Sequence, residues 1–159
     1  MSMIIDGTNG LTFNNATTQA SAGVILQVVQ SSTIANASTT SNSFVTTGIS
    51  ISITPKFATS KILIGAYGSA IGIPTNAQPS LTFYRGGSNL GGTEGQLLTF
   101  NANASLIQTP IVLQYLDSPA TTSSTTYTLY WRNANNSATI VIAGGNNVQL
   151  NLFAWEIAA

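Results

Sequence analysis

The chain has 159 residues and a mass of 16.5 kDa, which corresponds to one domain of ordinary size. Only 5% of the residues are charged, four Lys or Arg and four Asp or Glu, and there is no His and no Cys; soluble domains average about 25% charged residues. This composition excludes a basic patch for nucleic acid, thiolate nucleophiles, imidazole bases, disulfides and the common His/Cys metal centres. We therefore expect no nucleic-acid partner and no cofactor.

Short apolar or alternating segments recur along the chain, separated by clusters of Gly, Pro, Asn and Ser, and the charged helix formers are almost missing. In chain order, the pattern predicts strands over Val24–Gln30, Phe44–Thr54, Lys61–Ala70, Ser80–Arg85, Gln96–Phe100, Leu106–Leu116, Thr125–Arg132, Ser137–Ala143 and Val148–Ile157. Strands at this even spacing predict an all-β chain, an antiparallel β-sandwich, and most specifically a jelly roll.

The first 23 residues differ from the rest. Their apolar side chains are too few to build a core, and residues 14–23 are wholly small or polar. We expect residues 1–23 to form an extended N-terminal arm and linker, and residues 24–159 to form the jelly-roll domain. Because such arms often gain order only against another chain, we expect this one to dock onto a partner through Ile4, Ile5, Leu11 and Phe13.

Membrane insertion and secretion are not expected. No apolar run approaches the roughly 18 residues that a spanning helix needs. The N-terminus also lacks the basic flank and the long apolar stretch of a secretory signal.

The few ionisable groups argue against catalysis, so we expect the chain not to be an enzyme. A Ser–His–Asp triad cannot be built without histidine, and a glycosidase pair would have to come from the four carboxylates Asp6, Glu94, Asp117 and Glu156. Nothing local brings two of them together. With no His, stability should be nearly flat between about pH 5.5 and 9, and Glu156 in the closing strand is the first place to look for a buried carboxylate.

Two apolar features favour an interaction role. Some strands are apolar on both faces, as in Ile62-Leu63-Ile64 and Ile111-Val112-Leu113, so their outer face should also be covered, and neighbouring subunits can cover it. Zero net charge favours self-association as well. We expect a homotrimer whose interface candidates are Ile62, Ile64, Leu113, Tyr115, Phe153 and Trp155. Most aromatic residues should be core, but Tyr84, Tyr130 and Trp131 are candidate glycan contacts.

Several segments together resemble tail-fibre and other virion surface proteins of cyanophages and marine bacteriophages. They are Ile5-Asp6-Gly7-Thr8-Asn9-Gly10-Leu11-Thr12-Phe13 with Thr17-Thr18-Gln19, Val24–Gln30, Ile51–Lys56, Ser60–Ile64, Phe83–Gly87, Tyr115–Pro119, Thr125–Thr128 and Trp155–Ala159. The resemblance covers nearly the whole chain. It implies a trimeric jelly roll similar to the tumour-necrosis-factor and complement type, and it brings no catalytic residues.

The resemblance implies a virion protein, assembled in the cytoplasm of a bacterial host. Because the chain reaches the junction segment almost directly after Met1, we expect a small stand-alone component, a capsid decoration (cement) protein or head-fibre knob that docks onto the major capsid protein or a fibre or tail component. The alternative is a tail-fibre head that recognises host-surface glycans.

Overall fold

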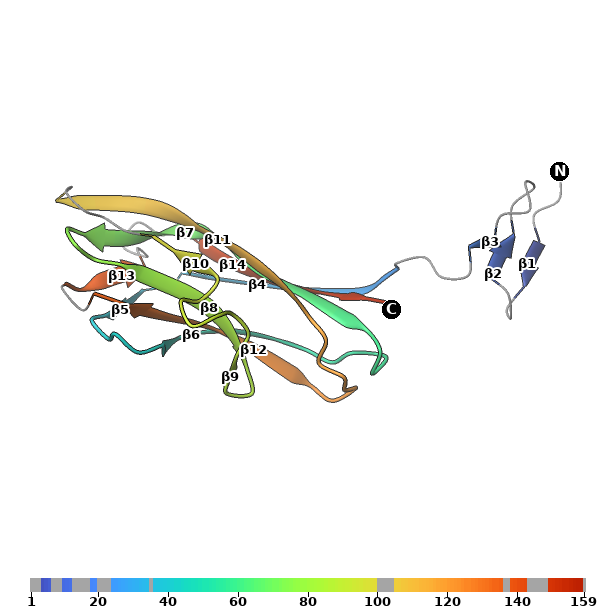
Figure 1. Cartoon of the computed structure of the whole chain (residues 1–159). Coiled ribbons are helices and arrows are strands. Elements are labelled where there is room, and N and C mark those ends of the chain that lie inside the picture. The colour runs from blue at the N-terminus through green and yellow to red at the C-terminus, as the bar shows by residue number, and fades with distance from the viewer. Residues whose placement is uncertain are drawn as a thin grey trace.

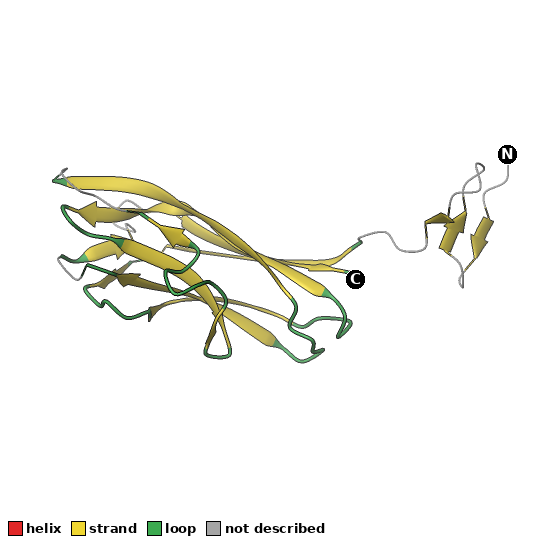
Figure 2. Ribbon diagram, in the orientation of Figure 1, coloured by secondary structure: helices red, strands yellow, loops and turns green. Residues whose placement is uncertain are grey.

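The computed structural model describes residues 4–6, 10–12, 18, 19, 24–34, 36–99, 105–135, 138–142 and 149–158. These residues form strands, turns and loops, with no helix among them. Figures 1 and 2 show two antiparallel sheets that pack face to face as a sandwich. The prediction of an all-β antiparallel sandwich is confirmed.

The first sheet of the sandwich, called the β7 sheet here, is built around the long strand β7. Its strands are β4 (Ile25–Ile34), β14 (Gln149–Ile157), β7 (Lys61–Pro74), β13 (Ile140–Ile142), β5 (Ala37–Thr39) and β11 (Leu106–Asp117). On one side β7 pairs with β14 and then β13, and on the other side with β11. β4 pairs with β14, and β5 pairs with β13.

The second sheet, called the β12 sheet, contains β10 (Leu97–Leu98), β8 (Pro79–Arg85), β12 (Thr125–Asn133), β6 (Val45–Ile53) and β9 (Ser88–Asn89). The order β4-β14-β7-β11 faces the order β6-β12-β8-β10. Numbered along the chain, these eight strands place the first, eighth, third and sixth in one sheet and the second, seventh, fourth and fifth in the other. That is the strand order of a jelly roll.

Tertiary pairing extends one strand beyond its sequence pattern. Val24–Gln30 was predicted to end before a run of hydroxyl residues, but β4 continues through Ser31, Ser32 and Thr33, because their backbone groups pair with β14. The hydroxyl run gave no apolar signal from which this could be foreseen.

The N-terminal segment contains local structure of its own. β1 (Ile4–Asp6), β2 (Gly10–Thr12) and β3 (Thr18–Gln19) form a small antiparallel sheet in the order β1-β2-β3. No strand pairing joins these three strands to the sandwich in the described part of the chain. Ile4, Ile5 and Leu11 lie on β1 and β2, while Phe13 lies outside the described residues.

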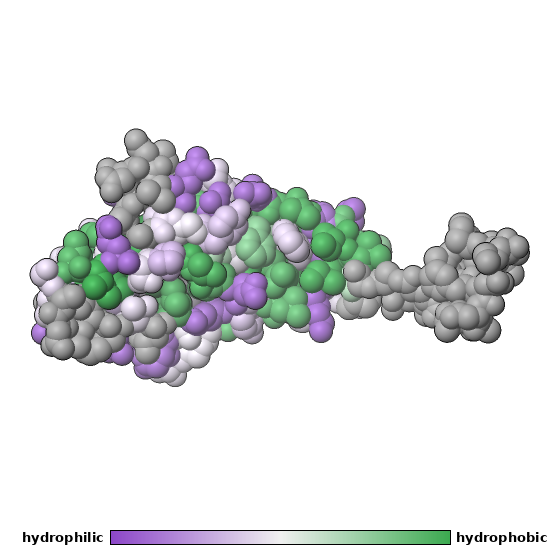
Figure 3. Space-filling model, turned by 90° about the horizontal axis from the view of Figure 1, so that it is seen from above, coloured by the Kyte–Doolittle hydropathy of each residue, from purple (hydrophilic) through white to green (hydrophobic). Residues whose placement is uncertain are grey.

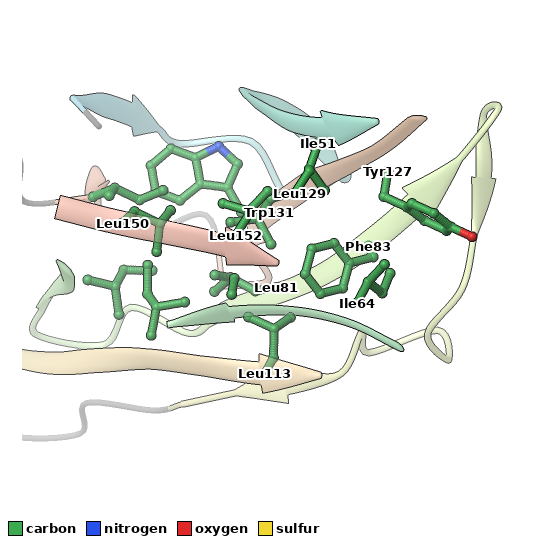
Figure 4. Packing of buried hydrophobic residues seen from close by; sticks show 14 of the residues in the cluster. Ile51, Ile64, Leu81, Phe83, Leu113, Tyr127, Leu129, Trp131, Leu150 and Leu152 are labelled. Carbon is green, nitrogen blue, oxygen red and sulfur yellow. The ribbon is translucent and has the colours of Figure 1, made fainter. Parts of the chain in front are cut away.

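The core lies between the two sheets and is made mainly by alternate residues of the strands, most regularly on β12. On β12, Tyr127, Leu129 and Trp131 point inward and are at most 1% exposed. Figure 4 shows them packed against side chains of the opposite sheet, among them Ile64 and Leu152. Each such side chain contributes about 1.5–3 kcal/mol by burial.

Candidate interaction surfaces

Three of the predicted subunit-interface residues lie in the core instead. Ile62 and Ile64 are completely buried, and Leu113 is 6% exposed. Tyr115, on the same side of β11 as Leu113, is partly buried and packs against the core. The prediction of an outward position is therefore wrong for these residues, because the face of β7 that carries Leu63, not the one that carries Ile62 and Ile64, is the outer face.

The outer face of the β7 sheet presents an apolar surface in the part of the sheet where β4, β14, β7 and β11 lie side by side. The exposed fractions are large: 58% for Val28, 42% for Tyr67, 65% for Val112 and 49% for Leu116. Figure 3 views the molecule from above Figure 1, that is, from the side on which β7 and β11 lie. It shows apolar surface gathered over the half of the molecule nearer the C-terminus. The outward positions, called the outer face from here on, are Val28, Gln30, Ser32, Leu63, Gly65, Tyr67, Val112, Gln114, Leu116, Asn151, Phe153 and Trp155.

Aromatic rings lie in a row across this outer face. The Phe153 ring centroid is 6.2 Å from that of Tyr67 and 5.4 Å from that of Trp155, and both pairs are tilted by 47°. Phe153 is opposite Gly65 on the neighbouring strand, and its ring occupies the space that a Cβ at Gly65 would need. Because Gly65 has no side chain, the Phe153 ring can pack directly against the backbone of β7.

None of the twelve outer-face positions carries a charge. Two of the six predicted interface residues, Phe153 and Trp155, lie on this outer face, whereas Ile62 and the other three lie on the core side. A contiguous apolar surface with no charge is typical of a surface that another protein covers. Leu63, the sequence neighbour of the buried pair, is the residue that the prediction should have chosen.

A second cluster of aromatic side chains lies on the outer face of the β12 sheet. The rings of Tyr84 and Tyr130 are stacked, with centroids 3.9 Å apart and planes 21° apart. Trp131 is 1% exposed and points into the core, so the prediction of a glycan contact is wrong for this residue. Strand alternation sends Tyr130 outward and Trp131 inward.

The stacked tyrosines are part of a packed assembly. Phe44 lies beside Tyr84, with centroids 6.2 Å apart, and the Arg132 guanidinium lies 4.8 Å from the centre of the Phe44 ring. Arg132 also forms an ion pair of 2.6 Å with Glu94, whose side chain is 60% exposed. Tyr130 covers one ring face of Tyr84, and both side chains are partly exposed.

Asp117 and Glu94 are each held in an ion pair with an arginine. Asp117 accepts hydrogen bonds from Arg85 and from the Tyr127 hydroxyl, a link between the two sheets. Burial, and then the neighbouring Asp117, raise the pKa of Tyr127 well above its ordinary value, so this hydroxyl remains a donor. Glu94 is bound to Arg132, so Glu94 and Asp117 have different cationic partners rather than forming an acid–base pair.

Glu156, predicted from the sequence as the first place to look for a buried carboxylate, is completely buried at the end of the sandwich. Its Oε1 accepts hydrogen bonds from the backbone amides of Lys56 (2.7 Å) and Phe57 (3.3 Å), and its Oε2 accepts one from Gln27 (2.6 Å). Burial alone would raise the pKa of Glu156, but these bonds and the neighbouring Ser60 hydroxyl outweigh it and lower the pKa below its ordinary value. The carboxylate thus fixes the β6–β7 loop to β14 and β4.

Among the described residues, no group of three or more His, Cys, Asp or Glu side chains is placed to hold a metal ion. No helix in the described part of the chain is long and apolar enough to cross a membrane. The sequence matches no protein-family model and no curated protein. The candidate functional sites are the two outer surfaces, because they carry the exposed apolar side chains and the stacked tyrosines.

Proposed function

We propose that this protein is a non-enzymatic structural component of a bacteriophage particle, a capsid decoration protein or head-fibre knob, and that it assembles as a trimer. The observation that carries the proposal is the uncharged outer face of the β7 sheet, with Val28, Val112 and Leu116 about half or more exposed. Burial of such a face between copies is favourable by about 25 cal/mol for each Å² of apolar surface. With a net charge of zero, no overall repulsion opposes the association.

The resemblance to virion surface proteins of cyanophages and marine phages supports the location on a particle. In this proposal the N-terminal segment docks through Ile4, Ile5, Leu11 and Phe13 onto the major capsid protein or onto a fibre or tail component. Assembly takes place in the cytoplasm of the bacterial host. The jelly roll then stabilises or decorates the particle without chemistry of its own.

Light scattering at micromolar concentration tests the trimer. The wild-type protein should have close to three times the chain mass of 16.5 kDa. Val112→Asp places a charge on the outer face, on its edge strand β11, and should give monomers, whereas Thr126→Asp, at an exposed position of the β12 sheet, should leave the trimer intact. A wild-type protein that is monomeric at this concentration contradicts the proposal.

Particle incorporation tests the docking role. Deletion of residues 1–22 should leave the sandwich folded, because no described pairing connects β1, β2 or β3 to it. The truncated protein should fail to join particles. Full occupancy by the truncated protein would show that docking belongs to the sandwich.

A tail-fibre head that recognises host-surface glycans is the second candidate. The observation that favours it is the pair Tyr84 and Tyr130 beside Arg132 and Glu94, because carbohydrate sites combine aromatic surface with charged hydrogen-bonding groups. Electron microscopy of labelled particles separates the two functions: label on the capsid shell supports decoration, and label on the tail tips supports the fibre head. Tyr130→Ala should reduce binding to host cells only in the second case.

A further inference from the structure

The free edge of β4 differs from the other edges of the sandwich. β4 pairs with β14 in an uninterrupted register from Gln27, opposite Glu156, to Ile34, opposite Gln149. No described strand pairs with its opposite edge. The strand Ile25–Ile34 contains no glycine, no proline and no charged residue. A long regular edge of this kind presents unpaired backbone donors and acceptors that can pair with another strand.

The other edges carry features that discourage strand pairing. β11 has Pro110, which lacks a backbone N–H, and a register shift directly after it. β6 is bent by a register shift near Gly48, whose φ is 78°. β5, β9 and β10 have only two or three residues each. Proteins blunt exposed edges by these means, so β4 is the one long described edge without protection.

The seam between β4 and β6 is open where the edge of β4 is free. A cavity of about 210 Å³ is lined there by Ser31, Thr33, Gly48, Ile49 and Ser50. Hydrogen bonds close the seam at its other end, where Gln27 donates to the Thr54 carbonyl and Lys56 donates to the Leu26 carbonyl. The accessible part of the edge is therefore 28–33.

We propose that β4 pairs antiparallel with β4 of a second copy of this chain, about a twofold axis at Ser31. A twofold contact places the same edge on both sides, so it must be self-complementary. β4 meets this requirement because it brings no like charges together and has no residue that interrupts the ladder. The pairing joins the two β7 sheets into one continuous sheet, and the two uncharged outer faces into one surface.

This contact uses the edge of the sheet and not its outer face, so it is independent of the threefold association proposed above. Light scattering over a concentration series distinguishes the two. The edge contact predicts species of two chains, or of six where both contacts form. A wild-type protein with only one or three chains up to roughly millimolar concentration overturns the edge proposal, and three chains would leave the proposed trimer standing.

A substitution at the edge provides the second arm of the test. Ser31 is exposed and borders the open seam. Ser31→Lys brings two ammonium groups together at the twofold axis. The dissociation constant of the contact that forms the species of two or six chains should therefore rise at least about tenfold. The control Ser124→Lys changes an exposed loop residue on a different part of the sandwich and should have no effect. An unchanged dissociation constant for a folded Ser31→Lys protein contradicts the proposal.

Crosslinking keeps the test decisive where the lysine disturbs folding. The chain has no cysteine, so Ser31→Cys introduces a single thiol next to the twofold axis. Under mild oxidation, most of this variant should become a disulfide-linked dimer, whereas Ser124→Cys should remain monomeric on a denaturing gel. Equal crosslinking of the two variants would contradict strand pairing at β4.

Discussion

Glu156 offers the sharpest test of the packing described for the end of the sandwich. Its carboxylate is buried and accepts hydrogen bonds from the amides of Lys56 and Phe57 and from the Gln27 side chain. Glu156→Gln keeps the shape of the side chain and replaces one acceptor oxygen by a donor. The substituted amide can accept from the β6–β7 loop or from Gln27, but not from both.

The expected loss follows from the bonds that disappear. A hydrogen bond to a charged group contributes about 1.5–3 kcal/mol, and a buried donor without an acceptor costs about 1–3 kcal/mol. We expect Glu156→Gln to lower the free energy of unfolding by about 2–4 kcal/mol, which corresponds to a Tm lower by about 5–15 °C for a domain of this size.

Thermal melts at pH 7 measure this difference, with Glu94→Gln as the matched control. Glu94 is 60% exposed in its ion pair with Arg132, and such surface pairs contribute about 0–1 kcal/mol. The control should therefore lower Tm by no more than about 3 °C. A Glu156→Gln protein that melts with the control would refute the view that this carboxylate holds the loop.

The acid dependence gives a second readout on the same variant. Because the pKa of Glu156 is lower in the folded state than in the unfolded state, its stabilising contribution is complete above the ordinary carboxyl pKa of about 4.3 and is lost as the pH falls through the folded-state value. The wild type should lose more stability than Glu156→Gln below about pH 4.

Three further results are expected. Gly65→Ala should lower stability by about 1–3 kcal/mol in thermal melts, because its methyl group displaces the Phe153 ring; an unchanged Tm would contradict the close approach. Trp131→Ala should cost about 3–5 kcal/mol in denaturant unfolding, and Tyr130→Ala distinctly less, since only Trp131 is buried; equal losses would speak against the assigned faces. Melts between about pH 5.5 and 9 should agree within roughly 10 °C, and a larger shift would reveal a titrating group that the structure does not account for.

Strand positions were predictable from the sequence because alternation is a local property. The segment Thr125–Arg132 corresponds to β12, Thr125–Asn133, and its alternate residues are indeed the buried ones. The same local pattern could not decide which side faced inward where both sides were apolar. Ile62-Leu63-Ile64 is such a case: Leu63 lies opposite Trp155 on the outer face, a pairing that depends on a strand more than 90 residues later.

The packed side-chain clusters could not be predicted, since they join residues that are distant in sequence. The contact of Phe44 with Arg132 and the bonds from Lys56 and Phe57 to Glu156 depend on strand register and loop placement. The sequence did indicate that Glu156 was the carboxylate to examine, because a charge in an apolar strand needs partners when it is buried. The sequence did not indicate which residues donate hydrogen bonds to Glu156.

An experimental structure of the assembled protein, by cryo-electron microscopy on particles or of the isolated oligomer, tests the central claim most directly. We expect three sandwiches around a threefold axis, with Val112, Phe153 and Trp155 of each copy in van der Waals contact with a neighbouring copy. Sandwiches whose β7 sheets expose these three side chains to solvent would contradict the claim that the outer face is the surface through which the protein assembles.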